Sequence, residues 1–133
     1  MAAGAGVATY GAGVWLYENY DSLVEKMKKE IEAIKKRKLN KYGVQYALVA
    51  TRSGCYPDVR GGTRYLNAGD VWKYGETTNP AGRYSNAALR SAGLEFIPEF
   101  YGTQTEIKIM EKIKIYNYYF AYGQLPPGNR IFR

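Results

Sequence analysis

Between residue 43 and the end of the 133-residue chain, strand-like and helix-like segments follow one another in an order that restricts the fold. Short runs rich in β-branched and aromatic residues indicate strands at 44–51, 71–75 and 94–101. Helical patterns occupy 83–92, which Gly93 closes, and 103–121. The order β-β-α-β-α predicts an α+β domain in which helices flank a small, mainly antiparallel sheet of three strands.

Local signals indicate how these segments begin and end. Residues 52–70 contain several glycines and a proline, which indicates a long loop or an irregular hairpin. Pro98 lies inside the third expected strand, so that strand is expected at a sheet edge or at a bulge. Thr103 and Glu106 form a capping-box pattern that opens the last helix. On that helix we expect a buried stripe made of Ile109, Ile113, Tyr116 and Phe120.

The chain before residue 43 divides into two parts. Residues 1–19 are rich in Gly and Ala, which predicts a flexible lead-in that is too short to span a bilayer. Residues 20–42 predict a basic amphipathic helix, because apolar side chains recur at helical spacing at Val24, Met27, Ile31 and Ile34. We therefore divide the chain into this lead-in, this helix and a domain formed by residues 43–133.

The charge of the chain bears on its partners. Nineteen Lys and Arg against twelve Asp and Glu give a net charge of +7, which favours nucleic acid over an anionic membrane or an acidic protein. The basic residues expected to contact nucleic acid are Lys35, Lys36, Arg37, Lys38, Lys41 and Arg90. The alternative reading of the run from 35 to 41 is a solvated helix face with no ligand.

The residue types that are missing restrict the chemistry. The chain has no His, which excludes His-ligated zinc, Ser-His-Asp triads and His general bases. Its single cysteine, Cys55, cannot form an internal disulfide and lacks a second thiol for zinc. Acid–base chemistry must therefore come from Tyr, Lys, Asp, Glu or this one Cys.

Five short patterns between residues 43 and 129 occur in a characteristic order. They are Gln45-Tyr46, Lys73-Tyr74-Gly75, Arg83-Tyr84, the helical segment from Glu106 to Glu111, and Leu125-Pro-Pro-Gly-Asn129. This set resembles the GIY-YIG nuclease superfamily, with Lys73 in place of the second motif tyrosine. The resemblance implies a metal-dependent endonuclease, with DNA favoured over RNA as the substrate.

The resemblance and the residue types together suggest a role for each candidate. Tyr46 would act as general base, provided that Lys73 shares its face of the sheet and lowers its pKa. Arg83 would clamp the scissile phosphate through its planar guanidinium group. Glu111 would hold one divalent cation, expected to be Mg²⁺. The supporting residues would be Tyr84, Asn129 and Gly75.

The two glutamates of the last helix have different explanations. Glu106 is explained better by the capping box than by metal binding. Glu111 lies among apolar residues, and a carboxylate in such surroundings usually has a partner or a metal. A salt bridge to Lys108 or Lys114 is the alternative to a metal.

The Gly/Ala start, the charged helix and the closing segment 123–129 resemble toxin domains of bacterial polymorphic toxins, including those on Rhs-type carriers. This resemblance implies an effector that a dedicated secretion system exports and that acts in the target-cell cytoplasm, without stable membrane insertion. A cognate immunity protein would neutralise it in the producing cell. Two alternatives stay open: a non-catalytic nucleic-acid-binding module, and an RNase toxin on the same fold.

Overall fold

The computed structural model describes the backbone of residues 7–132 and the side chains of residues 19–132. Helix α1 spans Val7–Lys35, so it begins before residue 20 and ends before residue 42, contrary to expectation. Of the expected flexible lead-in, residues 7–19 are helical and residues 1–6 lie outside the described residues. Helix formers such as Ala8 and Ala12 prevail over Gly11 and Gly13. Three residues after the end of the helix, Lys38 takes a left-handed conformation, with φ of 48°.

The central sheet has three antiparallel strands, as expected. They are β1 (Tyr42–Ala50), β4 (Val71–Thr77) and β5 (Leu94–Thr103), in the order β4-β1-β5. Tyr46 lies opposite Gly75, and Leu48 lies opposite Lys73. On the other side of β1, the pairing shifts between Gln45 and Tyr46, where Tyr46 is opposite Pro98. The proline is thus both on an edge strand and at an irregularity, where a missing N–H donor is tolerated.

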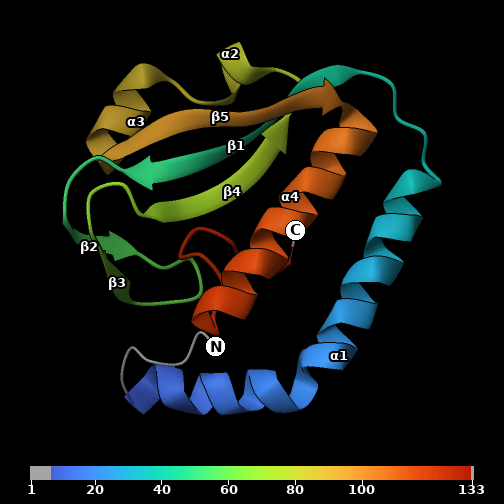
Figure 1. Ribbon diagram of the computed structural model, residues 1–133. Coiled ribbons are helices and arrows are strands. Elements are labelled where there is room, and N and C mark those ends of the chain that lie inside the picture. Colours follow the sequence, from blue (N-terminus) through green and yellow to red (C-terminus); the bar gives the residue numbers. More distant parts are fainter. Residues whose placement is uncertain (1–6, 133) are drawn as a thin grey trace.

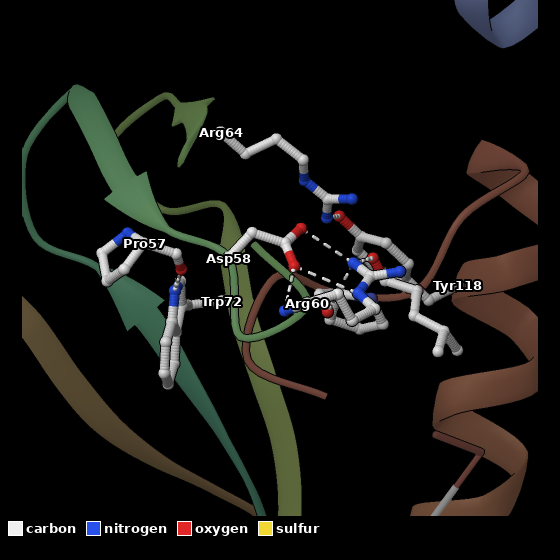
Figure 2. Close-up of polar contacts among 8 residues, drawn as sticks. Pro57, Asp58, Arg60, Arg64, Trp72 and Tyr118 are labelled. Carbon is white, nitrogen blue, oxygen red and sulfur yellow. Dashed lines mark hydrogen bonds and ion pairs between the residues drawn. The ribbon is translucent and has the colours of Figure 1, made fainter. Parts of the chain in front are cut away.

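A two-stranded hairpin occupies the glycine-rich region between β1 and β4. Its strands are β2 (Gly54–Pro57) and β3 (Thr63–Leu66), so the irregular hairpin is correct and the long loop is wrong. Its position is fixed by polar contacts that Figure 2 shows. Arg60 pairs with Asp58 at 2.9 Å, Arg64 Nη2 donates to Tyr118 Oη at 3.2 Å, and Trp72 Nε1 donates to the Pro57 carbonyl at 2.8 Å. The first contact holds the turn of the hairpin, and the other two join the hairpin to the last helix and to the sheet.

The segment expected as one helix from 83 to 92 forms two short helices. They are α2 (Pro80–Arg83) and α3 (Asn86–Ala92). Tyr84 between them is extended, and the Ser85 side chain caps α3 by accepting a hydrogen bond from Ala88 N. Gly93 ends α3 in a left-handed conformation, as expected. The break frees the Tyr84 side chain to turn toward the sheet.

The last helix, α4 (Gln104–Tyr122), begins with the expected capping box of Thr103 and Glu106. The expected buried stripe is wrong except at Tyr116. The buried residues of α4 are Ile107, Lys112, Ile115 and Tyr116. Helix α4 has neighbours on two sides, the sheet and α1, so a single apolar stripe does not describe it. Glu111, which precedes the buried Lys112 on this helix, is half-buried.

The elements form layers around the sheet (Figure 1). On one face, Tyr46 and Leu48 of β1 pack with Phe96 of β5, Leu89 of α3 and Tyr56 of the hairpin. The opposite face is covered by α4, and α1 lies against the outer side of α4. The core thus divides into a cluster on the α3 side of the sheet and a second cluster between α4 and α1.

We predict that Gly75→Ala lowers the free energy of unfolding by about 1–3 kcal/mol, as overpacked core positions usually do. A Cβ at residue 75 would overlap the ring of Tyr46. Denaturation in urea measures the loss. Tyr46→Leu removes the ring, so the double variant should lose less stability than the two single losses added together. Additive losses would contradict the close approach of these two residues.

Candidate functional site

The site is built around a pair of tyrosines on the α3 side of the sheet. Tyr46 Oη and Tyr84 Oη lie 2.8 Å apart and share a hydrogen bond. The Tyr46 ring is fully buried and stacks on Phe96 at a centroid distance of 4.6 Å. The Tyr84 ring meets the Tyr46 ring edge-on at 5.8 Å, and Tyr84 is only half-buried. Of the two phenols, Tyr84 is therefore the one that a ligand can reach.

Two cations lie at the exposed phenol. Lys73 Nζ approaches Tyr84 Oη at 3.5 Å, at the long end of hydrogen bonding. The Arg83 guanidinium lies over the Tyr84 ring, with Cζ 4.7 Å from the ring centroid. Lys73 shares the Tyr46 face of the sheet because it lies opposite Leu48, two residues along β1. The structure thus brings together four of the expected site residues, Tyr46, Lys73, Arg83 and Tyr84.

The expected pKa shift of Tyr46 is wrong. Burial raises the pKa of the Tyr46 phenol well above its ordinary value, and the hydrogen bond and charge of Tyr84 raise it further. Arg83 lowers the pKa of Tyr46, but less than burial raises it. Tyr46 therefore keeps its proton at neutral pH, which favours a hydrogen-bond donor in this position over a proton acceptor.

Glu111 lies apart from the tyrosine pair, on the other face of the sheet. It belongs to α4, whose Lys108 and Tyr118 contact Glu76 and Tyr74 of β4. Those two β4 residues alternate with Lys73 and therefore point away from Tyr46. The positive charge of Lys73 nevertheless acts on Glu111, because it lowers the pKa of the Glu111 carboxyl. Lys73 is the one site residue that acts on both groups.

Glu111 is poised between its two protonation states. Burial is the largest cause that raises its pKa, the negative charge of Glu76 is the next, and together they raise it to about 7. The expected alternative of a salt bridge is wrong, because Lys108 pairs with Glu76 at 3.3 Å and Lys114 pairs with Glu99 at 3.7 Å. Among the described residues, Glu111 is therefore a half-buried carboxylate without an ion pair to a lysine.

A divalent cation would fit beside Glu111. Among the described residues, Glu76 Oε2 is buried and has no hydrogen-bond partner. A cation between Glu76 and Glu111 would remove the repulsion that raises the pKa of Glu111 and would satisfy this orphaned oxygen. Within the described part of the chain, no group of three or more acidic or Cys side chains could hold a metal. Water and a substrate phosphate would have to complete the coordination, as Mg²⁺ commonly allows.

Asn129 and Gly75 support the site through the backbone. Asn129 Oδ1 accepts from Tyr74 N at 2.9 Å, and Asn129 Nδ2 donates to the Tyr74 carbonyl at 3.0 Å. Asn129 is buried, so it acts as an extra strand partner along the outer edge of β4. Gly75 leaves the space that the Tyr46 ring fills. Both residues fix the strand from which Lys73 projects.

The expected nucleic-acid contacts fall in two places. Lys35, Lys36, Arg37, Lys38 and Lys41 lie exposed at and beyond the end of α1, and Lys35 pairs with Glu32. This segment is tied to the start of α4, because Leu39 N donates to Thr105 Oγ1 at 2.7 Å. Arg90 lies on α3, on the opposite side of the sheet from α4, and belongs to no common patch with the others. Glu106 serves the capping box, as expected.

Glu76 is a candidate that the sequence did not single out. It follows Gly75 directly in β4, and strand alternation places it on the face opposite Lys73. The sequence did contain a signal for Glu76. It is an acidic residue directly after the motif, on the strand face that could lie against Glu111 of the last helix. Finding it required knowing that α4 covers that face.

Comparisons with known proteins add no relatives: no family model, curated protein or solved structure matches the chain. No helix within the described residues combines the length and the apolar character needed to cross a bilayer.

Asn129→Asp should destabilise the protein by about 1–3 kcal/mol, because a carboxylate would face the Tyr74 carbonyl without a donor. Thermal or urea unfolding measures the difference. Asn117→Asp is the matched control, because it makes the same chemical change at an exposed position on α4. Equal losses in the two variants would show that the Asn129 bracing of β4 contributes nothing.

Proposed function

We propose that this chain is a metal-dependent endonuclease of the GIY-YIG type that hydrolyses phosphodiester bonds, with DNA as its preferred substrate. The observation that carries the proposal is the position of Tyr84 Oη, between the buried Tyr46 phenol and the Lys73 ammonium, with Arg83 on its ring. The order of strands in the sheet and the unpaired carboxylate of Glu111 are consistent with it.

In this proposal the proton-accepting role moves from Tyr46 to Tyr84. The raised pKa of Tyr46 means that it stays protonated and can donate to Tyr84 Oη. Lys73 Nζ can donate to the same oxygen. Tyr84 Oη is thus the phenol oxygen that lies within reach of two donors and of a ligand, and it is placed to take the proton of an attacking water. Tyr46 is a positioning residue that acts through Tyr84.

The remaining residues bind the substrate. Arg83 is exposed and can clamp the scissile phosphate with two parallel hydrogen bonds. Glu111, assisted by Glu76, would hold one divalent cation, expected to be Mg²⁺. That ion, when bound, would supply positive charge at the departing 3′ oxygen. Lys73 lies between these groups and adds positive charge where the phosphate must lie.

We also propose that the chain acts as the effector domain of a bacterial polymorphic toxin. It would be exported by a dedicated secretion system, would act in the target-cell cytoplasm, and would be held inactive at home by an immunity protein. The net charge of +7 favours an acidic inhibitor, because opposite charge speeds association.

One observation favours a second candidate, a non-catalytic nucleic-acid-binding module. Glu111 and the tyrosine pair lie on opposite faces of the sheet. A metal at Glu111 and a base at the tyrosine pair would therefore have to contact the same phosphate from the two sides of the edge strand β4. Binding without Mg²⁺-dependent cleavage would support this candidate. An RNase would be recognised by cleavage of tRNA in preference to plasmid.

Supercoiled plasmid should be cleaved with Mg²⁺ and left intact with EDTA. Arg83→Ala and Glu111→Ala should each reduce the rate by about 100-fold or more, in the range found when a group that stabilises the transition state is removed. Glu95→Ala, an exposed change on β5, is the control and should cleave normally. Undiminished cleavage by either site variant would remove that residue from the active site.

The affinity of the protein for Mg²⁺ or Mn²⁺ should rise roughly tenfold per pH unit below pH 7 and level off above it, because the metal displaces a proton from Glu111. Glu111→Gln should abolish this pH dependence in calorimetric titrations. The metal-free protein should lose stability as pH rises from 4.5 to about 7, since the folded state holds this proton more tightly than the unfolded state. A flat affinity profile in the wild-type protein would rule out Glu111 as a ligand.

A further inference from the structure

A cavity of about 640 Å³ lies between α1, α4 and the segment that follows α4. The chain returns past α4 there, so that its C-terminal end lies beside that helix (Figure 1). Glu111 forms part of the wall of the cavity, and five cations surround it, namely Lys26, Arg37, Lys108, Lys112 and Arg130. The expected metal ligand thus faces a strongly basic space that the motif residues did not indicate.

Two of the five cations are already neutralised. Lys112 Nζ pairs with Glu30 at 3.3 Å and Lys108 Nζ pairs with Glu76 at 3.3 Å. Lys26, Arg37 and Arg130 have no ion pair with any carboxylate among the described residues. The three remaining cations outnumber the one unpaired carboxylate of the described lining, Glu111, so the cavity is positive and favours an anionic ligand.

The spacing of these cations indicates the size of the ligand. Lys26 lies on α1 nine residues before its end at Lys35, which is about 14 Å along the helix axis, and Arg37 lies beyond that end. The cations are therefore spread along the cavity and are not gathered around one point. The cavity is also lined by apolar side chains, including Ile34 and Phe132. Lys26 Nζ lies over the Phe132 ring, 5.2 Å from its centroid. A ligand with several phosphates and apolar faces between them satisfies both features.

We propose that this cavity binds the sugar–phosphate backbone of a nucleic-acid strand beside the scissile bond and guides it to Glu111. This inference rests on the proposed nuclease function and extends it, because it makes α1 part of the substrate cleft. Lys26 and Arg130 are the contacts that distinguish it from binding by the exposed basic run at residues 35–41. The occupant is a single strand, since its phosphates can contact the cations while its unpaired bases contact the apolar wall at Ile34 and Phe132.

The test is binding of a fluorescently labelled 12-nucleotide single-stranded DNA in EDTA, followed by anisotropy. The variant Lys26→Ala/Arg130→Ala should bind at least tenfold more weakly at moderate salt, and its salt slope should fall by about 1.4 for two lost contacts. Lys28→Ala/Lys29→Ala is the control, because it removes the same charge from the side of α1 away from the cavity. It should bind within threefold of the wild-type protein. Equal losses in both variants would overturn the proposal.

A second variant makes the test independent of charge. Ile34→Trp places a larger apolar side chain in the cavity and should weaken binding comparably while the protein stays folded by circular dichroism. Cleavage of plasmid separates the two proposals. A wild-type protein that does not cleave, but whose binding depends on Lys26 and Arg130, overturns the nuclease and supports the cleft. A protein that cleaves, and whose Lys26→Ala/Arg130→Ala variant binds and cleaves normally, overturns the cleft alone.

Discussion

The pairing of β1 with β4 is the constraint on which the rest of the site depends. Because Tyr46 lies opposite Gly75, its ring occupies the space that a side chain at residue 75 would fill, and its phenol is directed to Tyr84. The same register places Lys73 on the face of Tyr46 and Glu76 on the face of α4. A slip of one residue would exchange these two faces and separate Lys73 from Tyr84. Asn129 and the close fit at Gly75 both oppose such a slip.

This register also divides the charged groups between the two faces of the sheet. The α3 face holds buried phenols and two cations, whereas the α4 face holds carboxylates between lysines. Lys73 projects from an edge strand, which is why its charge reaches Glu111 although its side chain belongs to the other face. A phosphodiester bound at this edge would be the natural bridge between the two groups, because it offers oxygens to Arg83 on one side and to a cation at Glu111 on the other.

The parts of the fold that local chemistry determines could be predicted from the sequence. The three strands, the capping box at Thr103 and the left-handed end at Gly93 follow from residue type and spacing alone. The buried stripe of α4 could not be predicted, because α4 is covered by both the sheet and α1 and the sequence shows neither contact. The pKa of Tyr46 was misjudged for a related reason. Its burial is a property of packing, and desolvation outweighs the effect of a neighbouring cation.

The division of labour between the two tyrosines follows from the same balance. A phenol that is fully buried and hydrogen-bonded holds its proton, and the half-buried phenol beside it lies within hydrogen-bonding distance of two donors. The motif residue that the sequence marks as the base therefore has the environment of a scaffold, and its neighbour is the phenol that a ligand can reach. Glu111 is the opposite case. It is an acid that lies next to another acid, Glu76, so a bound cation would stabilise its ionised form strongly. Without a ligand, the repulsion between Glu76 and Glu111 costs free energy, and a bound cation would remove that cost. Such an arrangement is preorganised for a metal and a phosphate.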